Sequence, residues 1–274
     1  MNITKKAFST IGLIILSAII MFALTGCDSE ETKAAKESFN NEVERVQASY
    51  DALTAEIATA EELVVTEERP LDETLKPALE DAISDAKTVE FKSPSMPSGI
   101  DNINAATEEL KNTSFDDKTQ ALKDAETALS NSIEQRKLVT APSEAFIIER
   151  LRGIDGVGEI SAVTEDNDPN GHLGKEGWYT STVYFISPLV NQRDVYGTTV
   201  IEKGCDGGGA IEVYANEADA EKRNSYLSSF DGATMFSSGS HKVVGTVLIR
   251  TSDKLPASQQ KKLEADIIAS LTKL

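Results

Sequence analysis

The chain has 274 residues, with 45 Asp and Glu against 27 Lys and Arg, and its formal net charge is −18 at pH 7. Phosphate backbones and anionic membrane surfaces attract basic proteins, so this composition makes nucleic acid and bare anionic lipid poor partners. Only two cysteines are present, Cys27 and Cys205. A disulfide framework is therefore excluded if either of them is modified.

Residues 1–26 are typical of an export signal. Lys5 and Lys6 give a positive start, and residues 11–24 form a nearly unbroken apolar run. Its length fits the core of a signal peptide, about 7–15 residues, better than a membrane-spanning helix, which needs about 20. An uncleaved anchor helix is the alternative. In both cases we expect the rest of the chain to be tethered outside a membrane.

The tetrapeptide Leu24-Thr25-Gly26-Cys27 follows this run and resembles the lipobox of bacterial lipoproteins. The resemblance implies cleavage between Gly26 and Cys27 and attachment of a diacylglycerol to the Cys27 thiol. Two lipid chains hold a protein stably on a membrane where one does not. We therefore expect a lipid anchor on the extracytoplasmic face of a cell membrane. Cys205 then has no partner in the chain, and we expect it to be an ordinary half-buried loop thiol.

The mature chain divides into two parts of different composition. Up to Thr140 it holds 12 Lys and Arg against 26 Asp and Glu, whereas from Ala141 onward the counts are 13 against 19. The aromatic residues lie mostly in the second part. We predict an acidic helical bundle or stalk over residues 27–141 and an α+β domain over residues 142–274.

The acidic part shows helical periodicity. Apolar residues spaced alternately by four and three predict one long helix over about 29–68, which Pro70 ends. Three shorter helices are predicted around 75–86, 100–110 and 122–133, with a Pro- and Ser-rich loop over 91–99. The long seam consists of Phe39, Val43, Val46, Tyr50, Leu53, Ile57, Ala60 and Val64.

No helix in this part is apolar all round, so each one must pack on a neighbour or on a partner. The alanine and leucine pattern from Leu79 to Leu110 loosely resembles the small helical modules, of the FIVAR type, of Gram-positive surface proteins. That resemblance implies a stalk that holds the second part away from the membrane. A plain helical domain with no reach is the alternative.

The second part interleaves strands with amphipathic helices. We predict helices over 142–152, 217–230 and 256–274, and strands over 159–164, 178–186, 210–214 and 242–250. This order favours one mainly antiparallel sheet covered by helices. Glu212 lies within a strand and could be an inward carboxylate, but the polarity of the strand alone predicts that it faces solvent.

The loop after the first of these strands is rich in oxygen ligands. Asp166, Asp168 and Asn170 stand at alternate positions before Gly171, as in a calcium loop of the EF-hand type. Pro169 stiffens the loop, however, and the closing acid stands one position early. The same composition is typical of an ordinary long turn. Calcium is therefore the one cofactor hypothesis, and no other cofactor is expected.

Other patterns point to no known chemistry. His172 and His241 are too few for zinc, which usually needs three or four ligands, and we expect exposed loop residues. The glycines of Gly156-Val157-Gly158 resemble a helix-hairpin-helix, but the acidic loop that follows repels phosphate. A tight turn from helix to strand is the better interpretation. No catalytic motif of characteristic spacing is found.

Several segments resemble a domain that recurs in lipoproteins of Gram-positive and gut bacteria. The likeness covers about 130 residues and implies a membrane-tethered surface protein, and it carries over no catalytic residue. The segments are 162–171, 177–180, 208–214, 219–223 and 239–241.

The leading interpretation is a non-catalytic, lipid-anchored surface protein that is either a binding or a structural module, with a cell-wall component, a surface protein or a glycan as its partner. The candidate ligand-binding residues are Asp166, Asp168, Asn170, Trp178 and His241. The alternative is a hydrolase of the cell wall or of a surface polymer, with Asp166, Asp168 or Glu212 as acid and base, which requires carboxylates about 5–10 Å apart. A solute-binding component of a transporter needs two lobes, for which the second part is too small.

Overall fold

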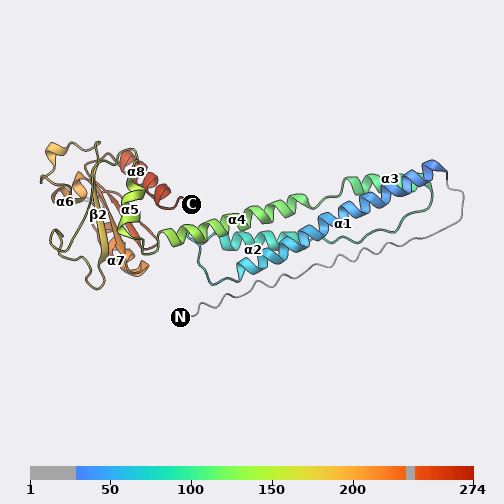
Figure 1. Cartoon of the computed structure of the whole chain (residues 1–274), viewed down its shortest axis with the longest axis horizontal. Helices are drawn as coiled ribbons and strands as arrows, with labels where there is room; N and C mark the ends of the chain where they lie inside the picture. The colour runs from blue at the N-terminus through green and yellow to red at the C-terminus, as the bar shows by residue number, and fades with distance from the viewer. Residues whose placement is uncertain (1–28, 233–237) are drawn as a thin grey trace. The chain divides into compact units, whose positions relative to one another are not determined.

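A computed structural model describes residues 29–232 and 238–274 (Figure 1). The protein is α+β, as predicted, with a helical N-terminal region followed by a five-stranded antiparallel sheet. The predicted leader and the lipobox with Gly26 and Cys27 lie outside the described residues. Within those residues, no helix combines the length and the apolar character that crossing a membrane requires.

Contacts divide the chain into two compact units. One holds the described residues up to Arg45 together with Pro94–Thr113, and the other holds Val46–Ser93 and Ser114–Leu274. The boundary that the sequence predicts between residues 141 and 142 stays a prediction.

The first helix, α1 (Glu30–Val64), agrees with the predicted long helix to within a few residues. Four seam residues two turns apart are its most buried apolar side chains, with exposed fractions of 2% or less: Phe39, Val46, Leu53 and Ala60. In the first unit, the Arg45 guanidinium donates to the carbonyl oxygens of Leu110 and Thr113 at 2.6 and 3.0 Å. The Leu110 carbonyl at the end of α3 (Ile100–Lys111) also accepts from the Thr113 backbone N–H at 2.9 Å, so the Arg45 bonds join α1 to the end of α3 and to the segment after it.

In the second unit, α2 (Leu75–Ala86) packs against α4 (Asp116–Leu138). Leu79 and Ile83 of α2 and Leu122 and Leu129 of α4 are buried. Hydrophobic burial of this kind stabilises short helices that would not form alone in water. All three shorter predicted helices are therefore present, and α4 is longer than predicted.

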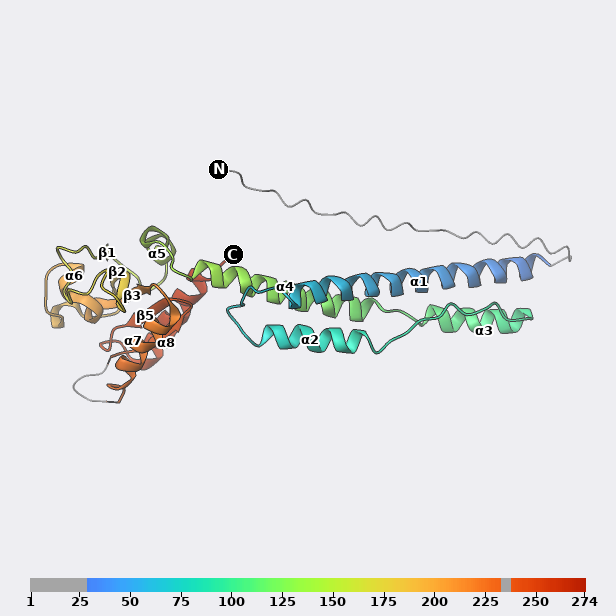
Figure 2. The ribbon, with the colours of Figure 1, turned by 90° about the horizontal axis from the view of Figure 1, so that it is seen from below.

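The sheet has the order β1-β2-β3-β5-β4, with every neighbouring pair antiparallel. Figure 2 labels β1, β2, β3 and β5 in this order across the sheet. The strands are β1 (Ile160–Ala162), β2 (Tyr179–Ile186), β3 (Gly208–Tyr214), β4 (His241–Val244) and β5 (Val247–Thr251).

The prediction of one strand over 242–250 is wrong, because the segment forms the β4–β5 hairpin. Gly245 lies at the turn with a φ of 60°, a conformation that glycine adopts without strain. A Cβ at this position would lie 2.4 Å from the carbonyl oxygen of Val139. The apolar residues on both sides of the turn make the segment look continuous in the sequence.

Helices cover both faces of the sheet. On one face, α5 (Glu144–Leu151) and α8 (Ala257–Leu271) bury Ile147, Leu263 and Ile267 against strand residues such as Phe185 and Ile249. On the other face, α7 (Glu217–Ser228) packs Ala220 and Leu227 against Tyr179, Tyr214 and Leu248. We call this second face the α7 face.

Between β2 and β3 the chain forms three short elements that the sequence analysis did not predict: η1 (Gln192–Asp194), α6 (Val200–Lys203) and η2 (Gly204–Gly207). A capping box starts α6, because Thr199 and Glu202 each accept a hydrogen bond from the other's backbone N–H. The sequence alone contains this signal for the start of a helix, because Thr199 and Glu202 have the spacing of a capping box.

Candidate functional site

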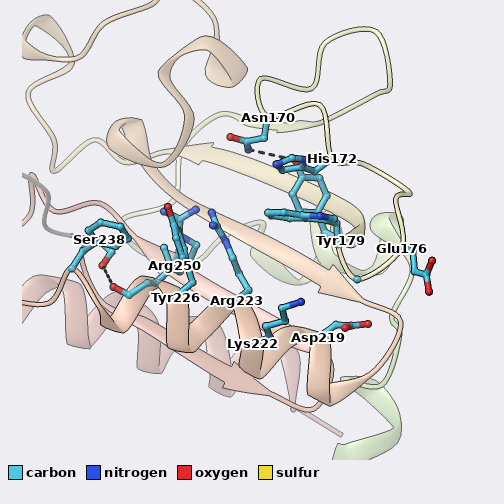
Figure 3. Close-up of a pocket in the computed structure, with 14 residues that line it drawn as sticks. Asn170, His172, Glu176, Tyr179, Asp219, Lys222, Arg223, Tyr226, Ser238 and Arg250 are labelled. Carbon is cyan, nitrogen blue, oxygen red and sulfur yellow. Dashed lines mark hydrogen bonds between the residues drawn. The ribbon is translucent and has the colours of Figure 1, made fainter.

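A pocket of about 830 Å³ lies on the α7 face of the sheet (Figure 3). Its walls come from the loop before β2, from α7 and the residues after it, and from β5. The residues that line it are Asn170, His172, Glu176, Gly177, Trp178, Tyr179, Asp219, Lys222, Arg223, Tyr226, Leu227, Phe230, Ser238 and Arg250. It therefore combines aromatic rings with three cationic side chains.

Asp168 holds the loop that forms one wall of the pocket. Its Oδ2 accepts hydrogen bonds from the backbone N–H groups of His172 and Leu173 at 2.6 and 2.8 Å. Its Oδ1 accepts from the N–H of Asn170 at 3.0 Å and from the hydroxyl of Tyr179 at 2.7 Å. Both carboxylate oxygens are thus occupied by donors of the protein itself.

The same hydrogen bonds set the ionisation of Asp168. Partial burial on its own would raise the pKa of this carboxyl, but the bonds from Leu173, Tyr179, Asn170 and His172 outweigh it and lower the pKa to about 2. Burial and then the hydrogen bond to Asp168 raise the pKa of Tyr179 above its ordinary value. Asp168 is therefore an ionised anchor of the loop.

An aromatic stack lies in the pocket wall. The His172 imidazole and the Trp178 indole have centroids 3.6 Å apart and planes inclined by 20°. The Asn170 amide donates weakly to the hydroxyl groups of Tyr179 and Tyr184, at 3.4 Å each. The loop thus presents a stacked pair of rings and a side-chain amide to the same pocket.

A buried charge cluster forms the floor below α7. The Glu212 side chain on β3 is 1% exposed and pairs with Arg250 Nη1 at 2.9 Å and with Arg223 Nε at 3.5 Å. Tyr214 donates its hydroxyl to Glu212 Oε2 at 2.6 Å. The prediction that Glu212 faces solvent is therefore wrong, because two arginines and a tyrosine compensate its charge inside the fold.

The two arginines have donors to spare. A guanidinium carries five N–H groups, yet within the described residues Arg223 and Arg250 together donate one hydrogen bond, from Arg250 to Glu212. Both Nε atoms are buried and make no hydrogen bond, although Arg223 Nε lies 3.5 Å from Glu212 Oε2. The Arg223 guanidinium also lies over the ring of Tyr226, 5.3 Å from its centroid. The cluster is thus cationic and incompletely paired.

The structure brings together two of the five predicted ligand-binding residues. Asn170 and Trp178 line the pocket, while Asp168 supports its wall from behind. Asp166 is exposed and is not among the lining residues.

His241 differs from the expectation of an exposed loop residue. Its side chain is 7% exposed, at the start of β4. Nδ1 lies 2.7 Å from Oδ1 of Asn224 on α7, and Nε2 lies 3.2 Å from Oδ1 of Asp231. It therefore ties β4 to α7 and does not line the pocket. His172 is half-buried by its stack on Trp178 and is likewise no exposed loop residue.

The calcium hypothesis gains no support from this geometry. Asp168 already uses both oxygens, and Ca²⁺ requires six to eight oxygen ligands. In the part of the chain that the structure describes, no group of three or more His, Cys, Asp or Glu side chains could hold a metal ion. The loop has the hydrogen bonds of an Asp-anchored turn, and the calcium hypothesis stays a prediction.

Cys205 lies in η2 and has no disulfide partner among the described residues. Burial raises the pKa of its thiol, so the reactive thiolate is disfavoured. This agrees with the expectation of an ordinary half-buried thiol.

Sequence reasoning missed Arg223, Arg250 and Tyr226 as pocket residues. One signal was present, because Glu212 and Arg250 are opposite charges within two otherwise apolar strands. The strand order was needed to bring them together, since β3 and β5 are neighbours in the sheet but lie more than 30 residues apart in the chain.

Comparisons with known proteins found no matching family model, no similar curated protein and no similar solved structure. The resemblances to surface lipoproteins and to FIVAR-type modules therefore rest on the sequence alone.

Proposed function

We propose that this chain is a lipid-anchored, extracytoplasmic surface protein that binds a component of the cell envelope in the α7-face pocket. The observation that carries the proposal is the pocket itself. It gathers the Trp178–His172 stack, Tyr226 and two incompletely paired arginines into one concave surface. Binding sites are typically concave and aromatic, with a few placed polar groups. The leader and lipobox in the sequence support the location.

We propose that the helical region is a bundle or coiled coil that spaces the binding domain from the lipid anchor. The buried heptad residues of α1 support this role, and so does the strongly acidic exterior of the region. An acidic spacer stays soluble and does not adhere to anionic lipid.

A non-catalytic role fits the ionisation of the carboxylates. A general acid in a glycoside hydrolase has a raised pKa, whereas hydrogen bonds lower the pKa of Asp168 to about 2. Glu212 is paired with two arginines and accepts from Tyr214. Neither carboxylate is arranged to donate a proton to a substrate.

The test is retention of solubilised envelope fragments on the immobilised chain from Asp28 to Leu274. The chain should retain material saturably, and Trp178→Ala should abolish retention. Tyr196→Ala is the matched control, because Tyr196 is an aromatic residue 93% exposed that does not line the pocket. Circular dichroism checks that each variant is folded, and Tyr226→Ala provides a second pocket variant. Retention that survives both pocket substitutions would contradict the proposal.

A further inference from the structure

We infer that the ligand of the α7-face pocket is an acidic sugar, with its carboxylate held by Arg223 and Arg250 and its ring against the aromatic wall. This inference rests on the proposed function, because it names the ligand class of the same pocket. Three features carry it: the charge of the arginine cluster, the preorganisation of the two guanidinium groups, and the aromatic surface beside them.

The charge of the cluster calls for a monoanion. Two guanidinium groups share one carboxylate, that of Glu212, so one positive charge remains uncompensated on the pocket floor. The Glu212 side chain is 1% exposed, so water cannot take its place as the partner of the two arginines. A carboxylate bound on the pocket side would neutralise the remaining charge and accept from the Nη–H groups that donate to no acceptor within the described residues.

The two guanidinium groups are held in place before any ligand arrives. Glu212 fixes Arg250 from one oxygen, and the Tyr214 hydroxyl fixes the other oxygen at 2.6 Å. Figure 3 shows Arg223 and Arg250 side by side, directed toward the wall that carries Asn170 and His172. Planar guanidinium groups that are already oriented match a carboxylate with little loss of side-chain freedom.

The other charged residues of the pocket disfavour a polyanion. Glu176 and Asp219 line the same pocket as Lys222. Asp219 accepts from the Asn216 side chain at 2.8 Å, and Glu176 points away from the arginines in Figure 3. The Asp219 carboxylate lines the same pocket as the arginines and repels a ligand that carries several negative charges. A single carboxylate fits this pattern better than a polyphosphate does.

The aromatic surface favours a ring over a peptide. Tyr226 is 56% exposed and meets Phe230 edge-on at 5.1 Å, and the Trp178–His172 stack lies in the facing wall. Aromatic faces beside a side-chain amide suit a sugar, which has apolar C–H faces and a hydroxylated edge. A bound peptide usually adds to a sheet edge, whereas β5, which supplies Arg250, is an interior strand.

Trp178 makes the test direct, because it is the only tryptophan of the chain and it lines the pocket. Its fluorescence would be followed in the chain from Asp28 to Leu274 during titration with methyl β-D-glucuronide or methyl β-D-glucoside. These two probes share a ring and differ in the carboxylate. We expect a saturable change with the glucuronide and at least about tenfold weaker binding of the glucoside, as expected for loss of a charged hydrogen-bonding partner.

Variants of Arg223 test whether the arginines bind the carboxylate of the ligand. Arg223→Gln should weaken glucuronide binding about tenfold or more and leave the weak glucoside binding unchanged. Arg223→Lys keeps the charge and the pairing with Glu212 but loses the planar fork, so it should be folded and still bind more weakly than the wild type. Arg193→Gln is the control, because Arg193 is exposed and does not line the pocket.

Several outcomes would overturn the inference. Equal affinity for glucuronide and glucoside would show that the carboxylate of the sugar is not recognised. Tighter binding of glycerol 3-phosphate would replace the sugar acid by a phosphate, and tighter binding of an N-acetylated dipeptide would replace it by a peptide. No fluorescence change with any probe would also overturn it. In each case retention of envelope fragments through Trp178 would leave the proposed function standing.

Discussion

The helical region and the sheet region place their charges in opposite ways. The helices carry ion pairs in solvent, such as Lys33 with Glu30, whose side chains are 61% and 91% exposed. Another is Lys87 with Glu61, at 52% and 50%. The sheet region instead buries Glu212 between Arg250 and Arg223. Ion pairs therefore serve solubility in one region, as Lys–Glu pairs, and the construction of a site in the other, as an Arg–Glu cluster.

This difference has an energetic basis. An exposed pair gains about 0–1 kcal/mol, because water screens both charges. A buried pair brings little net stability, but removing one partner leaves an uncompensated charge in the interior. The Glu212 cluster is thus better explained by the orientation that it gives to two arginines than by the stability of the fold.

The largest expected effect is that of Glu212→Ala. It should lower the free energy of unfolding by about 3–5 kcal/mol, because it leaves Arg250 and Arg223 buried without a counter-charge. Glu61→Ala, which removes an exposed partner of Lys87, should cost less than about 1 kcal/mol. Urea unfolding followed by far-UV circular dichroism measures both. An equal loss of unfolding free energy in the two variants would contradict the difference between the buried cluster and the exposed ion pairs.

Asp168→Asn should have the next largest effect. Asn cannot accept four hydrogen bonds as the carboxylate does, and we expect a loss of about 2 kcal/mol at pH 7. The exposed Asp166→Asn is the matched control. The measurement is the unfolding midpoint in urea, and a loss of the same size in Asp166→Asn would argue that the loop composition matters rather than this anchor.

The pH dependence of Asp168 has a definite sign. Its folded-state pKa of about 2 lies below the ordinary value of 3.8, so its contribution is present above pH 4 and is lost as the pH falls from about 4 toward 2. The wild type should therefore lose stability over this range more steeply than Asp168→Asn. Parallel curves for the two proteins would contradict the assignment.

The sequence predicted the features that depend on local pattern. The seam residues Val46 and Leu53 are fully buried, and β2 lies where the alternating Thr, Val, Tyr and Phe residues placed it. The Asp168 loop was recognised as special, but its spacing could not tell an anchor of backbone N–H groups from a calcium ligand. The structure distinguishes these two roles, because the Leu173 N–H and the Tyr179 hydroxyl both donate to the Asp168 carboxylate.

The rest depended on contacts between distant segments. The sequence does not show which strands are neighbours, so it could not place Arg250 on β5 beside Glu212 on β3, nor Arg223 of α7 above both. The β4–β5 hairpin was missed for a local reason, because Gly245 is the only glycine in an otherwise apolar run.

The smallest expected effect comes from a half-buried carboxyl group of the helical region. Glu126 of α4 departs from the exposed pattern, because burial and then repulsion from Glu56 of α1 raise its pKa from 4.5 to about 7. Its Oε1 is buried without a partner, and Lys123 lies 3.7 Å from Glu56. A raised carboxyl pKa means that the fold favours the protonated form, so stability should fall as the pH rises from about 4.5 to 7.

Glu126→Gln mimics the protonated form and should raise stability by about 1–2 kcal/mol at pH 8, with little change at pH 4. Urea unfolding at the two pH values measures this, with Glu134→Gln as control, since Glu134 pairs with Lys137 on the exposed surface of the same helix. A gain in stability of equal size at both pH values would show that the effect does not come from the ionisation of Glu126.

Binding in the α7-face pocket is tested most directly by mapping the binding surface with NMR. The ¹H–¹⁵N spectrum of the chain from Asp28 to Leu274 would be recorded while solubilised envelope fragments are added, with attention to the Trp178 indole and the Arg223 and Arg250 Nε–H groups. We expect the shift changes to cluster at these three side chains and at the loop around Asn170. Changes confined to the helices α1 to α4, with the pocket signals unmoved, would contradict this expectation.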